Sequence, residues 1–272
     1  MIRKFEFNQI YVIESLPSYE VATGTSLFND LIARRTTEIS YLQSQLLTVS
    51  NKQEFYKVLT DIQQNCSTAV SNSPLLHLEM HGSKDGLVLA SGETVPWVDL
   101  ANAIRHINKA TGHNTLISLA TCHGAFFLSA ISPSQPAPCF AFIGSAEILY
   151  VPDIVESFHS FFDHILREAN PQNINLALAV EILNRSITAG RKFHLLGSEA
   201  IFNLVMDEYE STLWKPGGLS RRIKELVEDY YKRLGNKKSS LSKNQVKKQM
   251  EFNLIHGRHE TREKFKRAFL FE

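Results

Sequence analysis

The chain has 272 residues, 43% of them hydrophobic, and a formal net charge of +1. Such a chain can bury a full core, which excludes a disordered protein and fits one large domain or a domain with an appendage. No apolar run reaches the roughly 18 residues of a membrane helix, and the opening "MIRKFEFNQIYVIESLP" alternates like a strand instead of resembling a signal peptide. We therefore expect a cytoplasmic protein without membrane contact.

Apolar or alternating segments rich in β-branched and aromatic residues predict the strands. In chain order they are Phe5–Glu14, Gln45–Ser50, Leu75–His81, Thr115–Thr121, Cys139–Ser145 and Phe193–Gly197. Helical patterns lie between them, at Leu27–Ser40, Asn51–Asn65, Val95–Asn108, Pro152–Arg167 and Ile174–Arg185. A hairpin is expected around Ser91 and Gly92. The alternation predicts an α/β fold with a doubly wound, mainly parallel sheet and helices on both faces.

The carboxyl-terminal part of the chain differs in charge from the rest. Residues 1–214 carry 13 Lys and Arg against 21 Asp and Glu, a balance of −8, whereas residues 215–272 carry 16 against 7, a balance of +9. The turn-forming segment Trp214–Ser220 separates the two parts. We expect one domain at residues 1–213 and a basic helical region at residues 214–272.

Cap and stop residues predict three helices in this basic region. Ser220 could cap a first helix that ends at Gly235. Ser242 and Gln245 form a capping-box pattern for a second helix that ends at Gly257, and a third is expected within residues 260–271.

Two apolar strands end in reactive side chains. "LLHLEMHG" ends in His81 and Gly82, and "NTLISLATCHGA" contains Cys122. In an open α/β sheet, ligands and reactive residues gather at the carboxyl ends of parallel strands. If these two strands are neighbours, an imidazole and a thiol meet there as base and nucleophile. The backbone N–H groups of Gly82 and Cys122 could then bind the oxyanion of a tetrahedral intermediate.

These two motifs and the residues between them resemble the caspase-like cysteine peptidases, in particular the bacterial branch that includes the CHAT proteins. The resemblance implies a doubly wound sheet and a Cys–His dyad, with His81 as base and Cys122 as nucleophile. It implies a cysteine endopeptidase that needs no cofactor and cleaves a protein or peptide substrate. It further implies a regulated effector, as in bacterial defence against phage, which a nucleotide signal or partner protein activates, with oligomerisation on activation.

The sequence departs from the animal caspase pattern Gln-Ala-Cys-Arg-Gly around the nucleophile. Ala120 stands where that pattern has glutamine, and the loop after the next strand, with Ser145 and Glu147 as candidate substrate-binding residues, has no arginine. We therefore expect cleavage that is not confined to aspartate, with a basic or small residue accepted before the cut.

Other interpretations remain open for the same residues. Cys122 could be a buried core thiol, which would make the chain an inactive caspase-like binding module. His123 is expected to be a bystander, because adjacent strand residues point to opposite faces. His77 and Glu79 could form a polar pair at a sheet edge or orient His81, and Glu147 could be an ordinary exposed glutamate.

The basic region also allows two interpretations. Its lysines and arginines could form a solvated face or dock on the acidic domain, or Arg221, Arg222, Lys247 and Lys248 could bind an anionic signal. Nucleic acid is not expected as a partner, since no row of aromatic residues accompanies the basic ones. The remaining cysteines, Cys66 and Cys139, lack Cys-x-x-Cys spacing, so neither disulfides nor a metal site is expected.

Overall fold

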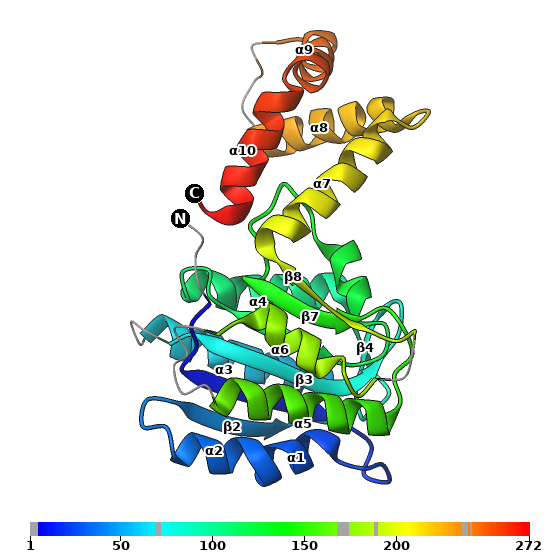
Figure 1. Cartoon of the computed structure of the whole chain (residues 1–272). Helices are drawn as coiled ribbons and strands as arrows, with labels where there is room; N and C mark the ends of the chain where they lie inside the picture. The colour runs from blue at the N-terminus through cyan, green and yellow to red at the C-terminus, as the bar shows by residue number, and fades with distance from the viewer. Residues whose placement is uncertain (1–4, 69–71, 168–173, 188–189, 236–238, 240) are drawn as a thin grey trace. The chain divides into compact units, whose positions relative to one another are not determined.

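The computed structural model describes residues 5–68, 72–167, 174–187, 190–235, 239 and 241–272 (Figure 1). The contacts divide the chain into two compact units. We call Met1–Ile131 with Ala137–Ala200 the sheet unit, and Ser132–Pro136 with Ile201–Glu272 the helical unit. The segment expected as a boundary, Trp214–Ser220, covers the end of one helix, a short connection and the start of the next helix, all within the helical unit.

The sheet unit is built on a mainly parallel sheet, as the alternation of elements predicts. Its path is β2-β1-β3-β6-β7-β8, and only β8 runs antiparallel to its neighbour. The strands are β1 (Gln9–Ser15), β2 (Gln43–Thr48), β3 (Pro74–Gly82), β6 (Leu116–Ala120), β7 (Ala141–Ser145) and β8 (Phe193–Gly197). β3 and β6 are buried along almost their whole length, which explains why their sequences are nearly continuous apolar runs.

The predicted hairpin follows β3. Its strands are β4 (Gly86–Val88) and β5 (Thr94–Pro96), and β4 pairs antiparallel with the end of β3 at His81 and Gly82. Gly92 has a φ of 85°, a left-handed conformation that glycine adopts without steric cost. The hairpin therefore pairs with the end of β3 that carries His81 and lies outside the path of the main sheet.

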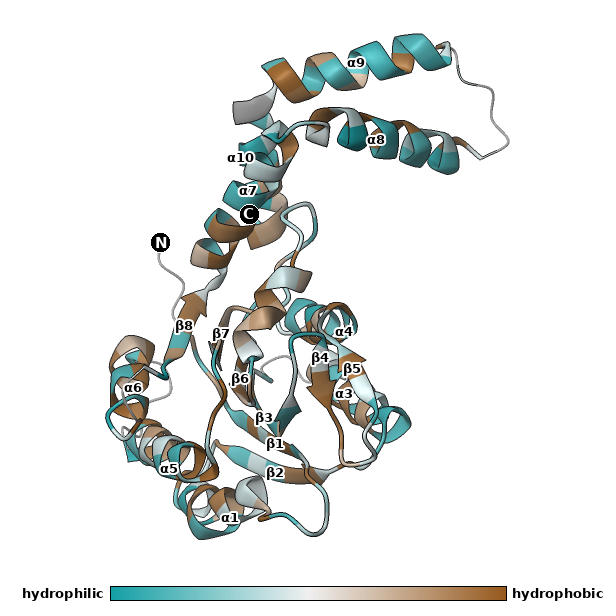
Figure 2. Ribbon diagram, turned by 90° about the vertical axis from the view of Figure 1, so that its right-hand side faces the viewer, coloured by the Kyte–Doolittle hydropathy of each residue, from teal (hydrophilic) through white to brown (hydrophobic). Residues whose placement is uncertain are grey.

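Helices cover both faces of the sheet. Figure 2 shows α3 and α4 on one face and α1, α5 and α6 on the other. The helices are α1 (Thr23–Leu27), the π-helical η1 (Phe28–Ile32), α2 (Ala33–Thr37), α3 (Lys52–Thr68), α4 (Trp97–Ala110), the 3₁₀-helical η2 (Gly124–Ala130), α5 (Val151–Arg167) and α6 (Leu176–Leu183). The α5 face holds a large aromatic core that includes Phe158, Phe161 and Phe162.

The helix expected at Leu27–Ser40 is wrong in its start and in its regularity. It begins at Thr23, four residues earlier than expected, and η1 interrupts it. The reason lies outside the segment. The buried carboxylate of Glu14 on β1 accepts hydrogen bonds from the backbone N–H groups of Gly24 (2.8 Å) and Thr25 (3.0 Å) and from the Thr25 hydroxyl (2.5 Å). A residue ten positions earlier thus caps the helix, and a local pattern cannot show that cap.

The helical unit contains α7 (Ser198–Trp214) from Ile201 onward, together with α8 (Gly218–Leu234), α9 (Lys243–His256) and α10 (Arg258–Leu270). The three helices predicted after the turn are present, and the Ser242–Gln245 capping box is confirmed. The predicted Ser220 cap is wrong. Gly217, with a φ of 78°, precedes the first helical residue. α8 and α9 share a small apolar cluster of Ile223, Val227 and Val246.

Among the described residues, none of the helices combines the length and the apolar composition needed to cross a membrane.

Candidate active site

His81 and Cys122 lie at the same edge of the sheet, because β3 and β6 are parallel neighbours. The register pairs His77 with Ser118 and Glu79 with Ala120. β3 continues beyond this register to His81 and Gly82, and Cys122 follows the last residue of β6, Ala120, in a turn, so both candidate residues lie just beyond the paired part of the two strands. The neighbouring strands that the sequence argument requires are therefore present, and both are central in the sheet (Figure 2).

Gly82 fixes how closely the two strand ends approach. A Cβ atom at this position would overlap the carbonyl oxygen of Cys122 and the Oγ1 of Thr121. Only glycine leaves room for this contact, so the backbone after the candidate base touches the backbone of the candidate nucleophile. The spacing between His81 and Cys122 is therefore set by the backbone contact at Gly82.

The Cys122 thiol is partly buried and contacts the loop that follows β7. Its Sγ lies 3.3 Å from the backbone nitrogen of Leu149, from which it accepts a hydrogen bond, and 3.8 Å from the Leu149 carbonyl oxygen. The hydrogen bonds between described residues include none from this thiol to His81. In this conformation Leu149 occupies the hydrogen-bonding positions of the sulfur.

The His81 imidazole is half-exposed and binds a carboxylate that the sequence argument missed. Its Nε2 lies 2.8 Å and 3.1 Å from the two carboxylate oxygens of Glu20, in the loop between β1 and α1. The signal for Glu20 is weak but present in the sequence. It follows β1 shortly after Pro17, and β1 is the other neighbour of β3. The pairing joins residues 61 positions apart, which no local pattern reveals.

His77 and Glu79 are buried side chains of β3, the strand that also carries His81. His77 Nε2 lies 3.1 Å from Glu79 Oε2, and His77 Nδ1 lies 3.1 Å from the Ser118 hydroxyl. The His77 ring also packs on Phe158, with ring centroids 4.6 Å apart. The expectation that this polar pair lies on an edge strand is wrong, because β3 lies between β1 and β6 and is an interior strand of the sheet. Both ring nitrogens of His77 have partners, and among the described residues no hydrogen bond links His77 or Glu79 to His81.

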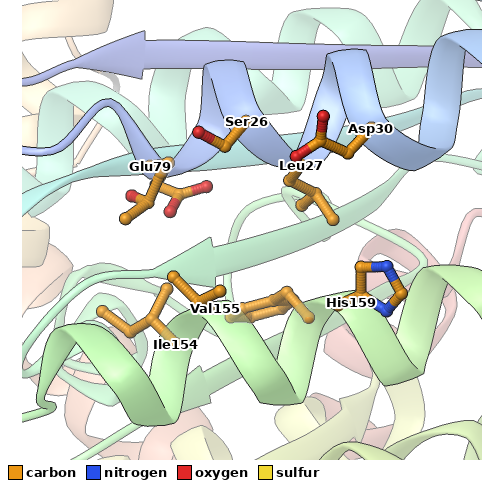
Figure 3. Close-up of a pocket in the computed structure, with 9 residues that line it drawn as sticks. Ser26, Leu27, Asp30, Glu79, Ile154, Val155 and His159 are labelled. Carbon is orange, nitrogen blue, oxygen red and sulfur yellow. The ribbon is translucent and has the colours of Figure 1, made fainter.

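Glu79 also lines a small cavity of about 50 Å³ between α1 and α5 (Figure 3). Figure 3 shows Ser26 and Asp30 on one wall and Val155 and His159 on the other. A Cβ atom on Gly24 would lie 3.0 Å from Glu79 Oε2 and 3.1 Å from Glu14 Oε1, so this helix start fits closely over the two carboxylates. The cavity has room for a few water molecules and no larger ligand.

The loops after β6 and β7 hold each other through His123. This residue has a left-handed φ of 57°, its N–H donates to the Glu147 carbonyl oxygen at 3.1 Å, and its Nδ1–H donates to the Ala146 carbonyl oxygen at 3.0 Å. Ser145 is fully buried, and its hydroxyl accepts from the Glu147 N–H at 3.2 Å. Of the two candidate substrate-binding residues, only Glu147 is exposed.

A groove of about 620 Å³ begins beside Glu20. Its walls come from the β1–α1 loop, from the end of β2 and from the β4–β5 hairpin, including Tyr19, Thr48 and Ser91. Tyr19 is 85% exposed, so an aromatic side chain is accessible in the groove beside Glu20. The groove is large enough for several side chains of an extended peptide.

The four candidate anion-binding residues fall into two places. Arg221 and Arg222 on α8 line a cavity of about 270 Å³ in the helical unit, whereas Lys247 and Lys248 are exposed on α9 and are not among its lining residues. Arg222 donates to Tyr209 at 3.2 Å and to Glu225 at 3.0 Å. Burial lowers the pKa of Arg222, but the hydrogen bonds to Glu225 and Tyr209 raise it, and the net pKa lies above the ordinary value. The structure brings the arginines together and leaves the lysines apart.

The two other cysteines are core residues. Burial raises the pKa of the Cys66 thiol to about 11, and it raises the pKa of Cys139 as well. Both therefore stay protonated at neutral pH. Among the described residues, no three His, Cys, Asp or Glu side chains are arranged to hold a metal ion.

The assignment of these residues depends on the motifs and on the geometry alone, because no protein-family model and no curated protein matches the chain.

Proposed function

We propose that the chain is a cysteine endopeptidase of caspase-like fold, with His81 and Cys122 as its dyad. The observation that carries the proposal is the placement of both residues at the carboxyl ends of the neighbouring parallel strands β3 and β6. The strand path, with its antiparallel last strand β8, is compatible with that fold. Reactive residues in open α/β sheets gather at this edge.

In the proposed reaction, the Cys122 sulfur attacks the scissile carbonyl carbon and its proton passes to His81. The tetrahedral oxyanion is stabilised by the N–H groups of Gly82 and Cys122. When the intermediate collapses, His81 protonates the leaving amine, and a thioester remains on Cys122. Water, deprotonated by His81, then hydrolyses the thioester and restores the thiol. Thiol acyl transfer of this kind needs no metal or organic cofactor.

In the proposed mechanism, the contact between Leu149 and Cys122 represents the resting state of the enzyme. The 3.3 Å hydrogen bond from the Leu149 N–H uses a lone pair of the sulfur that attack requires. Productive binding therefore displaces the loop after β7 from Cys122. Because Glu147 belongs to the same loop and is exposed, its carboxylate would lie near a peptide bound at the sulfur. We propose that a basic or small residue is accepted before the cleaved bond.

Regulation is the second part of the proposal. A regulated effector needs a site where a signal acts, and the arginine-lined cavity of the helical unit, with Arg221 and Arg222, supplies one for an anionic signal such as a nucleotide or for a partner protein. The experiment is deletion of residues 215–272, which we expect to change activity while the dyad stays intact. Equal activity of the full and shortened chains, with and without cell extract, would contradict this part.

One observation favours a second candidate, an inactive caspase-like binding module. In the structure, the Cys122 sulfur is hydrogen-bonded to Leu149 and the His81 imidazole to Glu20, so each member of the candidate dyad has another partner. A peptide-like electrophile separates the two candidates. Labelling of Cys122 that disappears in His81→Ala supports the enzyme, and the absence of labelling in every condition supports the module. Proteome-wide cleavage profiling of the wild type against Cys122→Ala then identifies the substrate.

A further inference from the structure

We infer that Glu20 is a positioning residue for His81. Its carboxylate holds the Nε2–H of the imidazole, and this leaves Nδ1 as the nitrogen that takes the proton of Cys122. The inference rests on the proposed peptidase function, and it assigns a role to a residue that the motif argument does not contain.

The first argument is the tautomer. A carboxylate only accepts hydrogen bonds, so the nitrogen that lies 2.8 Å and 3.1 Å from the two Glu20 oxygens must carry the hydrogen. In a neutral imidazole the other nitrogen then has the free lone pair. Nδ1 of His81 makes no hydrogen bond to any residue in the described part of the chain, so it is open to the thiol or the substrate.

The second argument is charge. When Nδ1 takes the thiol proton, the ring becomes a cation, and a carboxylate in contact with Nε2–H stabilises that cation. The leaving amine is later protonated from the same ring. Glu20 therefore favours the charged state of His81 that forms during the reaction, without itself touching the substrate.

The third argument is that the loop carrying Glu20 is fixed at both ends. The backbone N–H of Glu20 donates to the Pro17 carbonyl oxygen at 2.9 Å, which closes a turn directly after β1. On the other side, the Thr23 N–H donates to the Val21 carbonyl oxygen at 2.9 Å, and Glu14 holds the start of α1. The carboxylate is thus presented to His81 by an ordered connection between two buried elements.

A purely stabilising role does not account for the pair. The side chains of His81 and Glu20 are 49% and 32% exposed, and ion pairs with this exposure contribute little to folding. Replacing Glu20 should therefore leave the fold intact, so that a loss of activity can be assigned to chemistry.

The kinetic test compares Glu20→Gln and Glu20→Asp with the wild type, using the full chain. We expect Glu20→Gln to lower kcat about tenfold to a hundredfold with KM unchanged, an effect of the size found when the partner that orients a metal-binding histidine is removed. Glu20→Asp keeps the negative charge and should recover part of kcat. Glu38→Gln, which breaks an exposed pair with Arg35 in the same unit, is the matched control and should change neither constant.

The spectroscopic test reads the ring itself and needs no substrate. Nitrogen chemical shifts of the His81 ring at alkaline pH should show the Nε2–H tautomer in the wild type. Glu20→Gln, whose amide can either donate or accept, should populate the Nδ1–H tautomer as well. An unchanged tautomer, or an unchanged kcat in Glu20→Gln, overturns the inference. If the wild type has no peptidase activity at all, the proposed function fails, and the tautomer alone decides whether Glu20 orients His81.

Discussion

The sulfur of Cys122 and the backbone nitrogen of Leu149 lie 3.3 Å apart, although 27 residues separate them in the sequence. This contact joins the end of β6 to the loop after β7, the two elements that the proposed reaction uses for its nucleophile and for substrate selection. We therefore expect the loop after β7 to move when the thiol is modified.

The first prediction concerns the dyad. Cys122→Ala and His81→Ala each reduce peptide turnover to background, because members of one catalytic unit do not contribute additively. Neither variant should unfold, since truncation at a partly exposed strand end leaves little cavity. Turnover and thermal denaturation of the two variants are the measurements. Residual turnover by Cys122→Ala above that of a blank would exclude the mechanism.

The second prediction concerns thiol accessibility. A small alkylating reagent at neutral pH should modify Cys122 and leave Cys66 and Cys139 unmodified, because the latter two are buried and their pKa values are raised by that burial. In denaturant all three should react. Mass spectrometry of the digested protein identifies the modified residues. Modification of Cys139 before Cys122 in the native state would contradict the assignment.

The third prediction is a pH dependence of stability that comes from Cys66. In the unfolded chain a thiol loses its proton near pH 8.5, whereas burial raises the pKa of Cys66 to about 11 in the folded protein. Between these pH values the unfolded state binds fewer protons, so the free energy of unfolding falls as pH rises. The contribution is at most about 1.4 kcal/mol per pH unit. Urea denaturation of Cys66→Ala should show a shallower decline than the wild type.

The fourth prediction concerns the buried cap of α1. Glu14→Ala removes the acceptor for the Gly24 and Thr25 N–H groups, and it should lower the free energy of unfolding by about 2–3 kcal/mol. Because this helix start anchors the loop that carries Glu20, the variant should also lower kcat. Denaturant unfolding and turnover test both effects. Glu38→Ala, on the same unit's surface, should change neither by a measurable amount.

The fifth prediction concerns substrate preference. Glu147→Gln should lower kcat/KM about fivefold for peptides with Lys or Arg before the cleaved bond, which corresponds to an exposed charge pair. Peptides with a small residue at that position should be cleaved as before. Cleavage-site profiling of both proteins provides the measurement, and an exclusive preference for aspartate in the wild type would contradict the prediction.

The sheet and its candidate dyad could be read from the sequence because their determinants are local. Nearly continuous apolar runs such as Leu116–Ala120 indicate buried parallel strands, and the residues after such a run lie at the carboxyl end of the strand. The hairpin at Gly92 and the Ser242 cap also depend on residues within a few positions of each other.

The parts that could not be read depend on partners far away in the sequence. The start of α1 is set by Glu14, and the orientation of His81 by Glu20, through contacts that exist only once the sheet has assembled. The burial of Ser145 likewise follows from the packing of β7 between β6 and β8. A sequence pattern contains these residues but not their pairing.

The overlap that a side chain at Gly82 would cause has a consequence for redesign of this protein. Since the two strand ends meet through their backbones, neither His81 nor Cys122 can be shifted alone by substituting its neighbours. A directed-evolution library aimed at new substrates should therefore leave both motifs unchanged and diversify the connections after β1 and β7. Substitutions in these two connections should leave the distance between His81 and Cys122 unchanged.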